Sequence, residues 1–117
     1  MITHGYVGRF APSPTGPLHF GSLVAALASY LDAKANGGRW LVRIEDLDPP
    51  REVTGSSSLI LKQLQALGME WNDDVLYQST RLSAYERILQ QLETREYCFN
   101  CDCSRQRISG LKGVYDG

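Results

Sequence analysis

The most restrictive feature of the sequence is a turn-rich segment, residues 11–17, in which three of seven positions are proline and one is glycine. Regular helices and strands do not accommodate this composition, because proline fixes φ and lacks the backbone N–H donor. The segment follows residues 5–10, whose aromatic and β-branched side chains predict a short strand. A new element must therefore begin after Pro17.

A helix is predicted after Pro17, because apolar residues recur there at steps of three and four, the period of one helix face. These residues are Phe20, Leu23, Val24, Leu27, Tyr30 and Leu31. A second stripe of small side chains suits close approach of the helix to a sheet, and it consists of Gly21, Ala25, Ala28 and Ser29. Gly37 and Gly38 end the helix, and residues 40–44 predict a buried strand. The two strands of this unit are expected to be parallel.

Two further helices and a brief strand are predicted downstream. The first helix spans residues 57–67 and ends at Gly68, in the C-terminal cap position. Its inward-facing residues would be Leu59, Ile60, Leu64 and Leu67. The strand is expected at residues 75–77. Ser83 and Glu86 have the spacing of a capping box for the last helix, which runs to about Arg95 and could begin a turn earlier. Its apolar face would consist of Tyr85, Ile88, Leu89 and Leu92.

The composition is that of an ordinary globular chain, with 43% hydrophobic and 21% charged residues. The net charge of -1 gives no support for non-specific binding to nucleic acids. The sequence has no apolar run of about 18 residues, which a membrane-spanning helix requires, and no secretion leader at its start. A cytoplasmic protein without a membrane partner is therefore expected.

Three cysteines, Cys98, Cys101 and Cys103, lie within six residues. Their spacing and odd number make a poor disulfide framework, so a metal site or a cluster of reduced thiols is expected. Residues 97–117 are interpreted as a separate small module after a domain formed by residues 1–96. Because the sequence stops without a closing helix or strand, we expect it to be part of a longer protein.

The predicted start of the first helix has the form of an anion site. Backbone N–H groups in the first turn of a helix have no partner within the helix and lie at the positive end of its dipole. Gly16 would allow a ligand to approach the backbone closely, and His19 could donate to a phosphate oxygen. Local chemistry leaves a plainer alternative open, in which Gly16 and Pro17 merely start the helix and His19 is solvated.

Residues 9–22, together with residues 42–52, resemble the amino-terminal half of the class I glutamyl-type aminoacyl-tRNA synthetases. The sequence His-Phe-Gly-Ser at residues 19–22 stands where that class carries a His-Ile-Gly-His signature, and Ser22 is a variation that the glutamyl group shows. Residues 48–52, Cys101, Cys103 and residues 113–117 are most similar to the glutamyl-queuosine tRNA(Asp) synthetases within that family. The resemblance implies the N-terminal half of a Rossmann-like α/β fold with a parallel sheet, followed by a small Cys-rich zinc module.

The resemblance also implies roles for individual residues. The ATP-binding residues would be Pro12, Thr15, Gly16, His19, Gly21 and Ser22. His19 would be the catalytic residue, and Gly21 would leave space for the adenosine end of ATP. The glutamate-binding residues would be Arg9, Ala11, Ser13 and Glu45. Arg9 would bind a carboxylate and Glu45 the ammonium group. The plainer alternative is a solvated Arg9 and a surface ion pair between Arg43 and Glu45. The acidic loop that follows is interpreted as a solvated helix cap, and its charged residues are Asp46, Asp48 and Arg51.

One structural zinc ion is implied by the same resemblance. Its ligands would be Cys101, Cys103, Tyr115 and a cysteine just beyond residue 117. Cys98 lies outside the matched spacing and is expected to be a buried apolar residue beside Tyr97 and Phe99. Three reduced thiols without a metal are the alternative.

For a complete protein, the resemblance implies activation of glutamate by ATP, with Mg²⁺, and transfer of glutamate to the queuosine base of tRNA(Asp). A monomer is expected. One alternative is an ordinary glutamyl-tRNA synthetase that charges tRNA(Glu), and another is a non-catalytic, zinc-containing binding module. The second signature loop of the family, of the Lys-Met-Ser-Lys-Ser type, would lie beyond residue 117, so this chain alone is expected to be inactive.

Overall fold

The computed structural model describes residues 5–111. The chain divides into two compact units, Met1–Leu82 and Ser83–Gly117. This division lies upstream of the boundary that the sequence suggested between residues 96 and 97, and it assigns the helix after residue 82 to the second unit.

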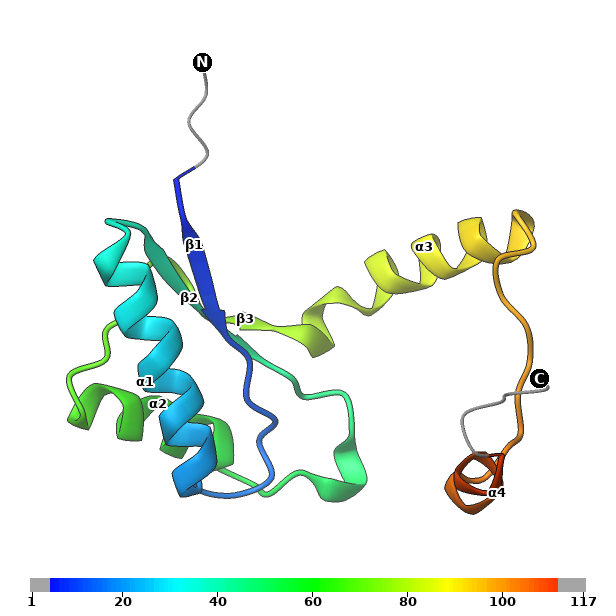
Figure 1. The fold of residues 1–117 in the computed structure, drawn as a ribbon, viewed down its shortest axis with the longest axis horizontal. Helices are drawn as coiled ribbons and strands as arrows, with labels where there is room; N and C mark the ends of the chain where they lie inside the picture. The colour runs from blue at the N-terminus through cyan, green and yellow to red at the C-terminus, as the bar shows by residue number, and fades with distance from the viewer. Residues whose placement is uncertain (1–4, 112–117) are drawn as a thin grey trace. The chain divides into compact units, whose positions relative to one another are not determined.

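The first unit is built around a three-stranded parallel sheet (Figure 1). Its elements in chain order are β1 (Val7–Phe10), α1 (Phe20–Ala35), β2 (Arg39–Ile44), the 3-10 turn η1 (Pro49–Arg51), α2 (Ser56–Ala66), β3 (Leu76–Tyr77) and the 3-10 turn η2 (Gln78–Arg81). The strand order is β1-β2-β3, with Val7 opposite Arg39 and Ile44 opposite Tyr77. The parallel α/β arrangement predicted from the sequence is therefore confirmed.

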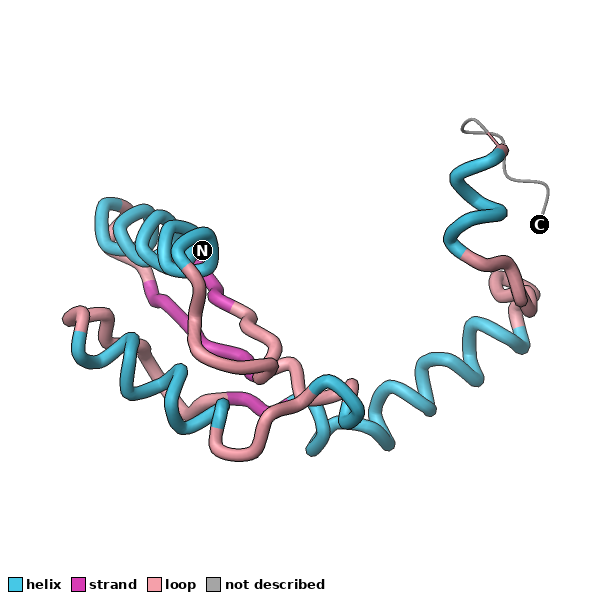
Figure 2. Tube along the Cα trace, turned by 90° about the horizontal axis from the view of Figure 1, so that it is seen from below, coloured by secondary structure: helices cyan, strands magenta, loops and turns pink. Residues whose placement is uncertain are grey.

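The core lies against one face of this sheet. Successive strand residues point to opposite faces, and Phe10, Trp40 and Ile44 share the face that packs against α1 and α2. The buried hydrophobic residues are Phe10, Ala26, Ala33, Trp40, Val42, Ile44, Ile60, Leu64 and Met69. Figure 2 shows the two helices beside the strands. Residues of α1, α2, β1 and β2 share this core. The core therefore also fixes where the loops at the carboxyl ends of the strands begin.

The large apolar residues whose period predicted α1 are mostly exposed. Phe20 is 82% exposed, and Val24, Leu27 and Leu31 are between 47% and 55% exposed. The periodicity correctly located the helix, but it did not identify the face that contacts the sheet. These side chains lie on a side of α1 that no other described part of the chain buries.

Small residues do form the contact between α1 and the sheet, and of the predicted ones Ser29 takes part, since its Oγ accepts a hydrogen bond from the Trp40 Nε1–H at 2.9 Å. Ala26 and Ala33 are fully buried, whereas Ala25 and Ala28 are exposed. The helix and β1 approach closely, because a Cβ atom added to Gly8 would lie 3.2 Å from the Ala33 Cβ atom. A larger residue at any of these contact positions would push the helix away from the sheet.

α2 buries Ile60 and Leu64 as predicted, but Leu59 and Leu67 are 42% and 60% exposed. Leu59 is rotated about 100° around the helix axis from Ile60, away from the sheet, and Leu67 is the C-cap residue beyond the last turn. Gly68 adopts φ of 77° after the cap, which confirms its predicted position.

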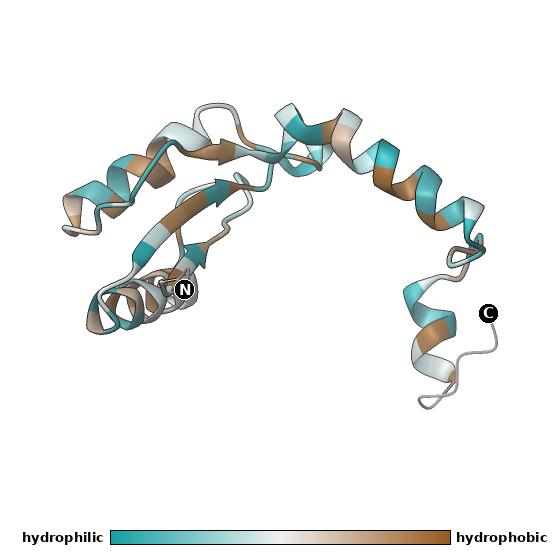
Figure 3. Cartoon of the chain, turned by 90° about the horizontal axis from the view of Figure 1, so that it is seen from above, coloured by the Kyte–Doolittle hydropathy of each residue, from teal (hydrophilic) through white to brown (hydrophobic). Residues whose placement is uncertain are grey.

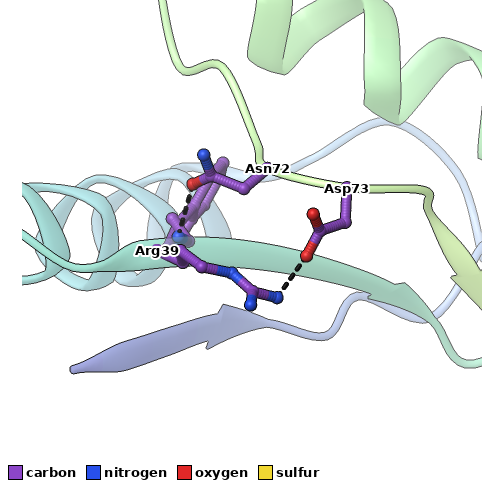
Figure 4. A network of polar contacts seen from close by, with 4 residues as sticks. Arg39, Asn72 and Asp73 are labelled. Carbon is purple, nitrogen blue, oxygen red and sulfur yellow. Dashed lines mark hydrogen bonds and ion pairs between the residues drawn. The ribbon is translucent and has the colours of Figure 1, made fainter. Parts of the chain in front are cut away.

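A polar network holds the amino end of β2 against the segment that follows α2 (Figure 4). The Trp40 N–H donates to Asn72 Oδ1 at 2.8 Å, and the Asn72 N–H donates to the Trp40 carbonyl at 2.8 Å. Arg39 forms an ion pair with Asp73 beside these bonds. The segment is thereby attached to β2 before β3 begins.

Among its described residues, the second unit contains α4 (Arg105–Gly110) and all but the first residue of α3 (Leu82–Thr94). α3 continues directly from η2 and starts at Leu82, so Ser83 is not its N-cap and the predicted capping box is wrong. Hydrophobic and hydrophilic residues alternate along α3 in Figure 3. The residues of its apolar face are all between 38% and 49% exposed, and they are Tyr85, Ile88, Leu89 and Leu92. Within residues 5–111, no helix is long and apolar enough to cross a membrane.

Candidate active site

The loop between β1 and α1 lines an open pocket of about 400 Å³ at the carboxyl end of β1. Its lining residues are Phe10, Ala11, Pro12, Ser13, Thr15, Gly16, Pro17, Leu18, His19, Gly21, Ser22 and Ala25. The pocket thus brings together every residue predicted to bind ATP. It also includes Ala11 and Ser13 from the predicted glutamate set, whereas Arg9 and Glu45 do not line it.

His19 is the N-cap residue of α1 and bonds to the first turn through both ring nitrogens. Nδ1 accepts a hydrogen bond from the Ser22 N–H at 3.2 Å, and Nε2 lies 3.0 Å from Ser22 Oγ. A ring nitrogen that accepts a hydrogen bond carries no proton, so this geometry requires a neutral imidazole with its proton on Nε2. Nε2 then donates to the Ser22 hydroxyl, whose own hydrogen can point to another acceptor.

Two glycines of the pocket are required for different reasons. A Cβ atom on Gly21 would lie 3.2 Å from two atoms of the His19 ring, so the missing side chain makes room for that ring. Gly16 has φ of 139°, which side-chain-bearing residues rarely adopt, and no atom lies within 4 Å of its ideal Cβ position. Backbone conformation therefore favours glycine at position 16, and packing favours it at position 21.

Two backbone donors of the loop bind to α2. The Gly16 N–H donates to Ser56 Oγ at 2.9 Å, and the Leu18 N–H donates to Gln63 Oε1 at 3.0 Å. Sequence reasoning missed both acceptors, because they lie 40 and 45 residues from their partners. A helical pattern gave no signal that a serine and a glutamine of α2 contact the loop.

The other backbone N–H groups of the loop and of the first helical turn indicate where an anion would bind. The Thr15 N–H donates to the Ser13 carbonyl at 2.9 Å, and Pro17 has no N–H. Phe20 and Gly21 are the first two helical residues, whose N–H groups have no acceptor within a helix. The start of α1, rather than the middle of the loop, therefore offers the backbone donors that an anion in this pocket would require.

Arg9 and Glu45 lie at the carboxyl ends of β1 and β2, which are parallel neighbours. Arg9 is exposed, and it lines a separate depression of about 640 Å³ along β1 and α1. The Glu45 N–H donates to the Pro12 carbonyl at 2.9 Å, which places Glu45 beside the loop of the pocket. Its carboxylate pairs with Arg43 at 2.6 Å, so the ion pair considered as the plainer alternative does form.

Asp46 bonds to a turn more than thirty residues away, a contact that the sequence did not suggest. Its two carboxylate oxygens accept hydrogen bonds from the Ser79 N–H at 2.9 Å and from the Ser79 hydroxyl at 2.5 Å. Burial alone raises the pKa of Asp46, but these hydrogen bonds outweigh it and hold the pKa below its ordinary value. The prediction of a solvated cap is wrong for Asp46. It fits Asp48, which pairs with Arg51 at 3.3 Å on the surface.

The predicted zinc ligands that the structure describes are Cys101 and Cys103. The Cys103 N–H donates to Cys101 Sγ at 3.4 Å, so the two residues are in direct contact, and neither forms a disulfide. Two neighbouring thiols are suitable as half of a tetrahedral zinc site. Tyr115 lies outside the described residues. Among residues 5–111, no group of three or more His, Cys, Asp or Glu side chains could hold a metal.

Cys98 is exposed, and the aromatic residues beside it, Tyr97 and Phe99, are 73% and 70% exposed. The expectation that Cys98 is buried is therefore wrong. The physical reason is that both aromatic neighbours stay on the surface, so they do not form a core around Cys98.

The parallel sheet, the Pro- and Gly-rich loop and the histidine-capped helix together define a catalytic domain of the class I synthetase type. Residues 6–115 match the family "tRNA synthetases class I (E and Q), catalytic domain". The chain belongs to this family.

Two proteins named glutamyl-Q tRNA(Asp) synthetase are similar to this chain over almost its whole length. The chain is 60% identical over 112 residues to the glutamyl-Q tRNA(Asp) synthetase of Shewanella oneidensis, a match that covers 96% of this chain and 38% of that protein. It is 57% identical over 117 residues to the protein of the same name from Escherichia coli K12, covering 100% of this chain and 38% of that protein. The chain thus spans little more than a third of the length of these relatives.

Solved structures agree with the fold. A glutamate tRNA ligase from Elizabethkingia meningosepticum, in complex with its amino acid, superposes with a TM-score of 0.74 at 34% identity, over 92% of this chain and 23% of that one. A glutamate-tRNA synthetase from Elizabethkingia anophelis gives a TM-score of 0.72 at 35% identity, over 90% and 23% of the two chains. These values extend the family assignment from sequence to three-dimensional structure.

Proposed function

We propose that a protein containing this chain activates glutamate with ATP and transfers it to the queuosine base of tRNA(Asp). The observation that carries the proposal is the pocket between β1 and α1, which gathers every predicted ATP-binding residue around the start of a helix. Sequence identity of 57% to 60% with glutamyl-Q tRNA(Asp) synthetases supports the choice of substrates.

ATP would bind with its phosphates at the start of α1. Activation increases the negative charge on the α-phosphate oxygens in the transition state, and donors that are already aimed at that position stabilise it. The Phe20 and Gly21 N–H groups and the helix dipole supply such donors. His19 would turn its Nε2 proton from Ser22 to a phosphate oxygen, which its neutral state allows. Mg²⁺ would accompany ATP as the usual counterion of its phosphates.

Glutamate would bind at the carboxyl ends of β1 and β2, where ligands of open α/β sheets are generally found. The Arg9 guanidinium would bind a carboxylate of the substrate, with Ala11 and Ser13 beside it. The Glu45 carboxylate would bind the ammonium group, in competition with its present partner Arg43. No nucleophile from the protein is needed, because a carboxylate oxygen of glutamate attacks the α-phosphorus of ATP, the bond from this phosphorus to the bridging oxygen breaks, and pyrophosphate leaves.

We also propose a structural zinc site with Cys101, Cys103 and Tyr115 as ligands. The contact between the Cys103 N–H and Cys101 Sγ supports the pair, and zinc in such a site would stabilise the segment after α3 without taking part in the reaction.

Two measurements on the full-length protein test the function. We expect exchange of pyrophosphate into ATP that depends on glutamate and does not require tRNA. We then expect glutamate to be transferred to tRNA(Asp) that carries queuosine, and not to tRNA(Asp) that lacks it. Transfer to the terminal adenosine of tRNA(Glu) would instead support an ordinary glutamyl-tRNA synthetase. Absence of exchange in a folded, metal-loaded preparation would reject both enzymes.

A further inference from the structure

Side chains of α2 form hydrogen bonds with the backbone of the β1–α1 loop. Ser56 bonds to both backbone groups of one residue: its Oγ accepts from the Gly16 N–H at 2.9 Å and donates to the Gly16 carbonyl at 2.7 Å. Ser56 is 2% exposed and is the buried polar residue of the described chain. A buried hydroxyl that uses both its donor and its acceptor on a single peptide position fixes the orientation of that position.

Two further bonds continue this contact along the loop. Gln63 lies almost two turns after Ser56 on α2, and its Oε1 accepts from the Leu18 N–H at 3.0 Å. The Val53 N–H, just before α2, donates to the Pro14 carbonyl at 3.0 Å. Bonds from one short region of the chain therefore reach Pro14, Gly16 and Leu18.

The loop needs such support because it supplies little of its own. Gly16 adopts φ of 139°, a conformation that glycine reaches readily but does not prefer strongly. Pro17 contributes no donor. Without the α2 side chains, the Gly16 and Leu18 N–H groups would turn to solvent, and the position of His19 one residue later would no longer be fixed.

We propose that Ser56 and Gln63 are positioning residues for ATP. Their hydrogen bonds to the loop backbone set the shape of the loop, and neither side chain contacts the nucleotide. Neither side chain lines the pocket, so each acts through the loop. The inference deepens the proposed function and rests on it for the identity of the nucleotide.

The experiment compares two pairs of matched variants of the full-length protein. Ser56→Ala removes the hydroxyl under the loop, and Ser58→Ala removes an exposed hydroxyl from the same helix. Gln63→Met removes the acceptor for Leu18 at nearly constant volume, and Gln65→Met makes the same change at an exposed position. The dissociation constant for ATP is measured by calorimetry, and the KM values for ATP and glutamate by pyrophosphate exchange.

We expect Ser56→Ala and Gln63→Met each to weaken ATP binding and raise the KM for ATP about tenfold, as loss of one or two hydrogen bonds predicts. The KM for glutamate should stay within about twofold of the parent, because uniform loss of nucleotide binding does not affect the second substrate. A purely structural role would instead lower the folded fraction, and with it the apparent kcat, while leaving both KM values unchanged. Ser56→Thr, which keeps the hydroxyl, should recover most of the ATP affinity.

Equal ATP affinities for the two members of each pair would overturn the inference. If Ser56→Ala does not fold, Gln63→Met decides the question, because Gln63 is only partly buried and its replacement keeps the side-chain volume. If the parent binds ATP but shows no glutamate-dependent exchange, the proposed function fails while the calorimetric comparison still decides the role of the two residues. A folded parent that does not bind ATP would overturn both.

Discussion

At position 19, a single histidine caps a helix and is also predicted to bind phosphate. The motif predicts a donor to phosphate, whereas the structure shows a helix cap in which Nδ1 accepts from the Ser22 N–H. The cap requires the neutral ring, and the neutral ring leaves one proton on Nε2 for a ligand. The two roles are therefore compatible, because each uses a different nitrogen.

The role of Arg9 can be tested by a single substitution. In the full-length protein, Arg9→Ala should abolish glutamate-dependent pyrophosphate exchange, because loss of a charge-assisted pair costs about 2–5 kcal/mol when its partner stays buried. Arg39→Ala is the control, since Arg39 lies on the neighbouring strand and pairs with Asp73 on the surface. Exchange at the parental rate in Arg9→Ala, with unfolding also unchanged, would remove Arg9 from the glutamate site.

Asp46 makes stability depend on acid pH. Because its pKa in the folded protein lies below the ordinary value of 3.8, its contribution to stability is present above that value and is lost as the pH falls through the lower folded-state pKa. Ser79→Ala removes one of the bonds that lower the pKa, so it should shift the acid unfolding midpoint to higher pH. Circular dichroism during an acid titration measures the midpoint, with Ser58→Ala as the control. An unchanged midpoint would show that the hydroxyl does not favour the carboxylate.

At the scale of elements, the sequence predicted where helices and strands lie better than which faces they bury. The positions of α1, β2 and α2 follow from periodicity and from the glycines that end each helix. The buried face of α1 does not follow, because it depends on contacts with other elements, such as the close approach of Ala33 to Gly8 on β1. The residues of the pocket were predictable because they are contiguous, whereas its supports on α2 are distant in sequence.

Two leucines of α2 differ in burial, so substituting each of them tests which face of the helix packs against the core. Leu64 is fully buried and Leu67 is 60% exposed, so the same substitution at the two positions should have unequal effects. We expect Leu64→Ala to lower the free energy of unfolding by about 2–5 kcal/mol and Leu67→Ala by less than about 1 kcal/mol. Urea denaturation of the full-length protein measures both values. Equal losses would indicate that another part of the protein covers Leu67.

The proposed ligands Cys101 and Cys103 predict the zinc content of the full-length protein. Preparations made without chelator should contain about one zinc ion per chain, the stoichiometry of one four-ligand site. Cys101→Ser should lose the zinc, because it removes one of the proposed thiolate ligands, whereas Cys98→Ser should keep it. Elemental analysis of the purified variants measures the content. Zinc retained by Cys101→Ser and lost by Cys98→Ser would show that the ligand pair is wrongly assigned.

At the scale of the whole molecule, the described chain leaves apolar surface exposed to solvent. The sheet face opposite the core carries Val7, which is 53% exposed, and β1 is an edge strand with one hydrogen-bonded neighbour in the described sheet. The apolar face of α3 is also exposed along its length. Surface of this kind and open strand edges favour association with other chains.

The polypeptide of 117 residues, expressed alone, should therefore bind an apolar fluorescent dye and self-associate as its concentration rises. It should not catalyse pyrophosphate exchange, because part of the proposed site would come from segments that the relatives have and this chain does not. Dye fluorescence, light scattering and the exchange assay, each compared with the full-length protein, measure these properties. A monomer that binds no dye would show that the exposed apolar side chains rearrange to cover one another. Exchange at the full-length rate would show that residues 1–117 contain the complete catalytic machinery, which would contradict the expectation that later segments complete the site.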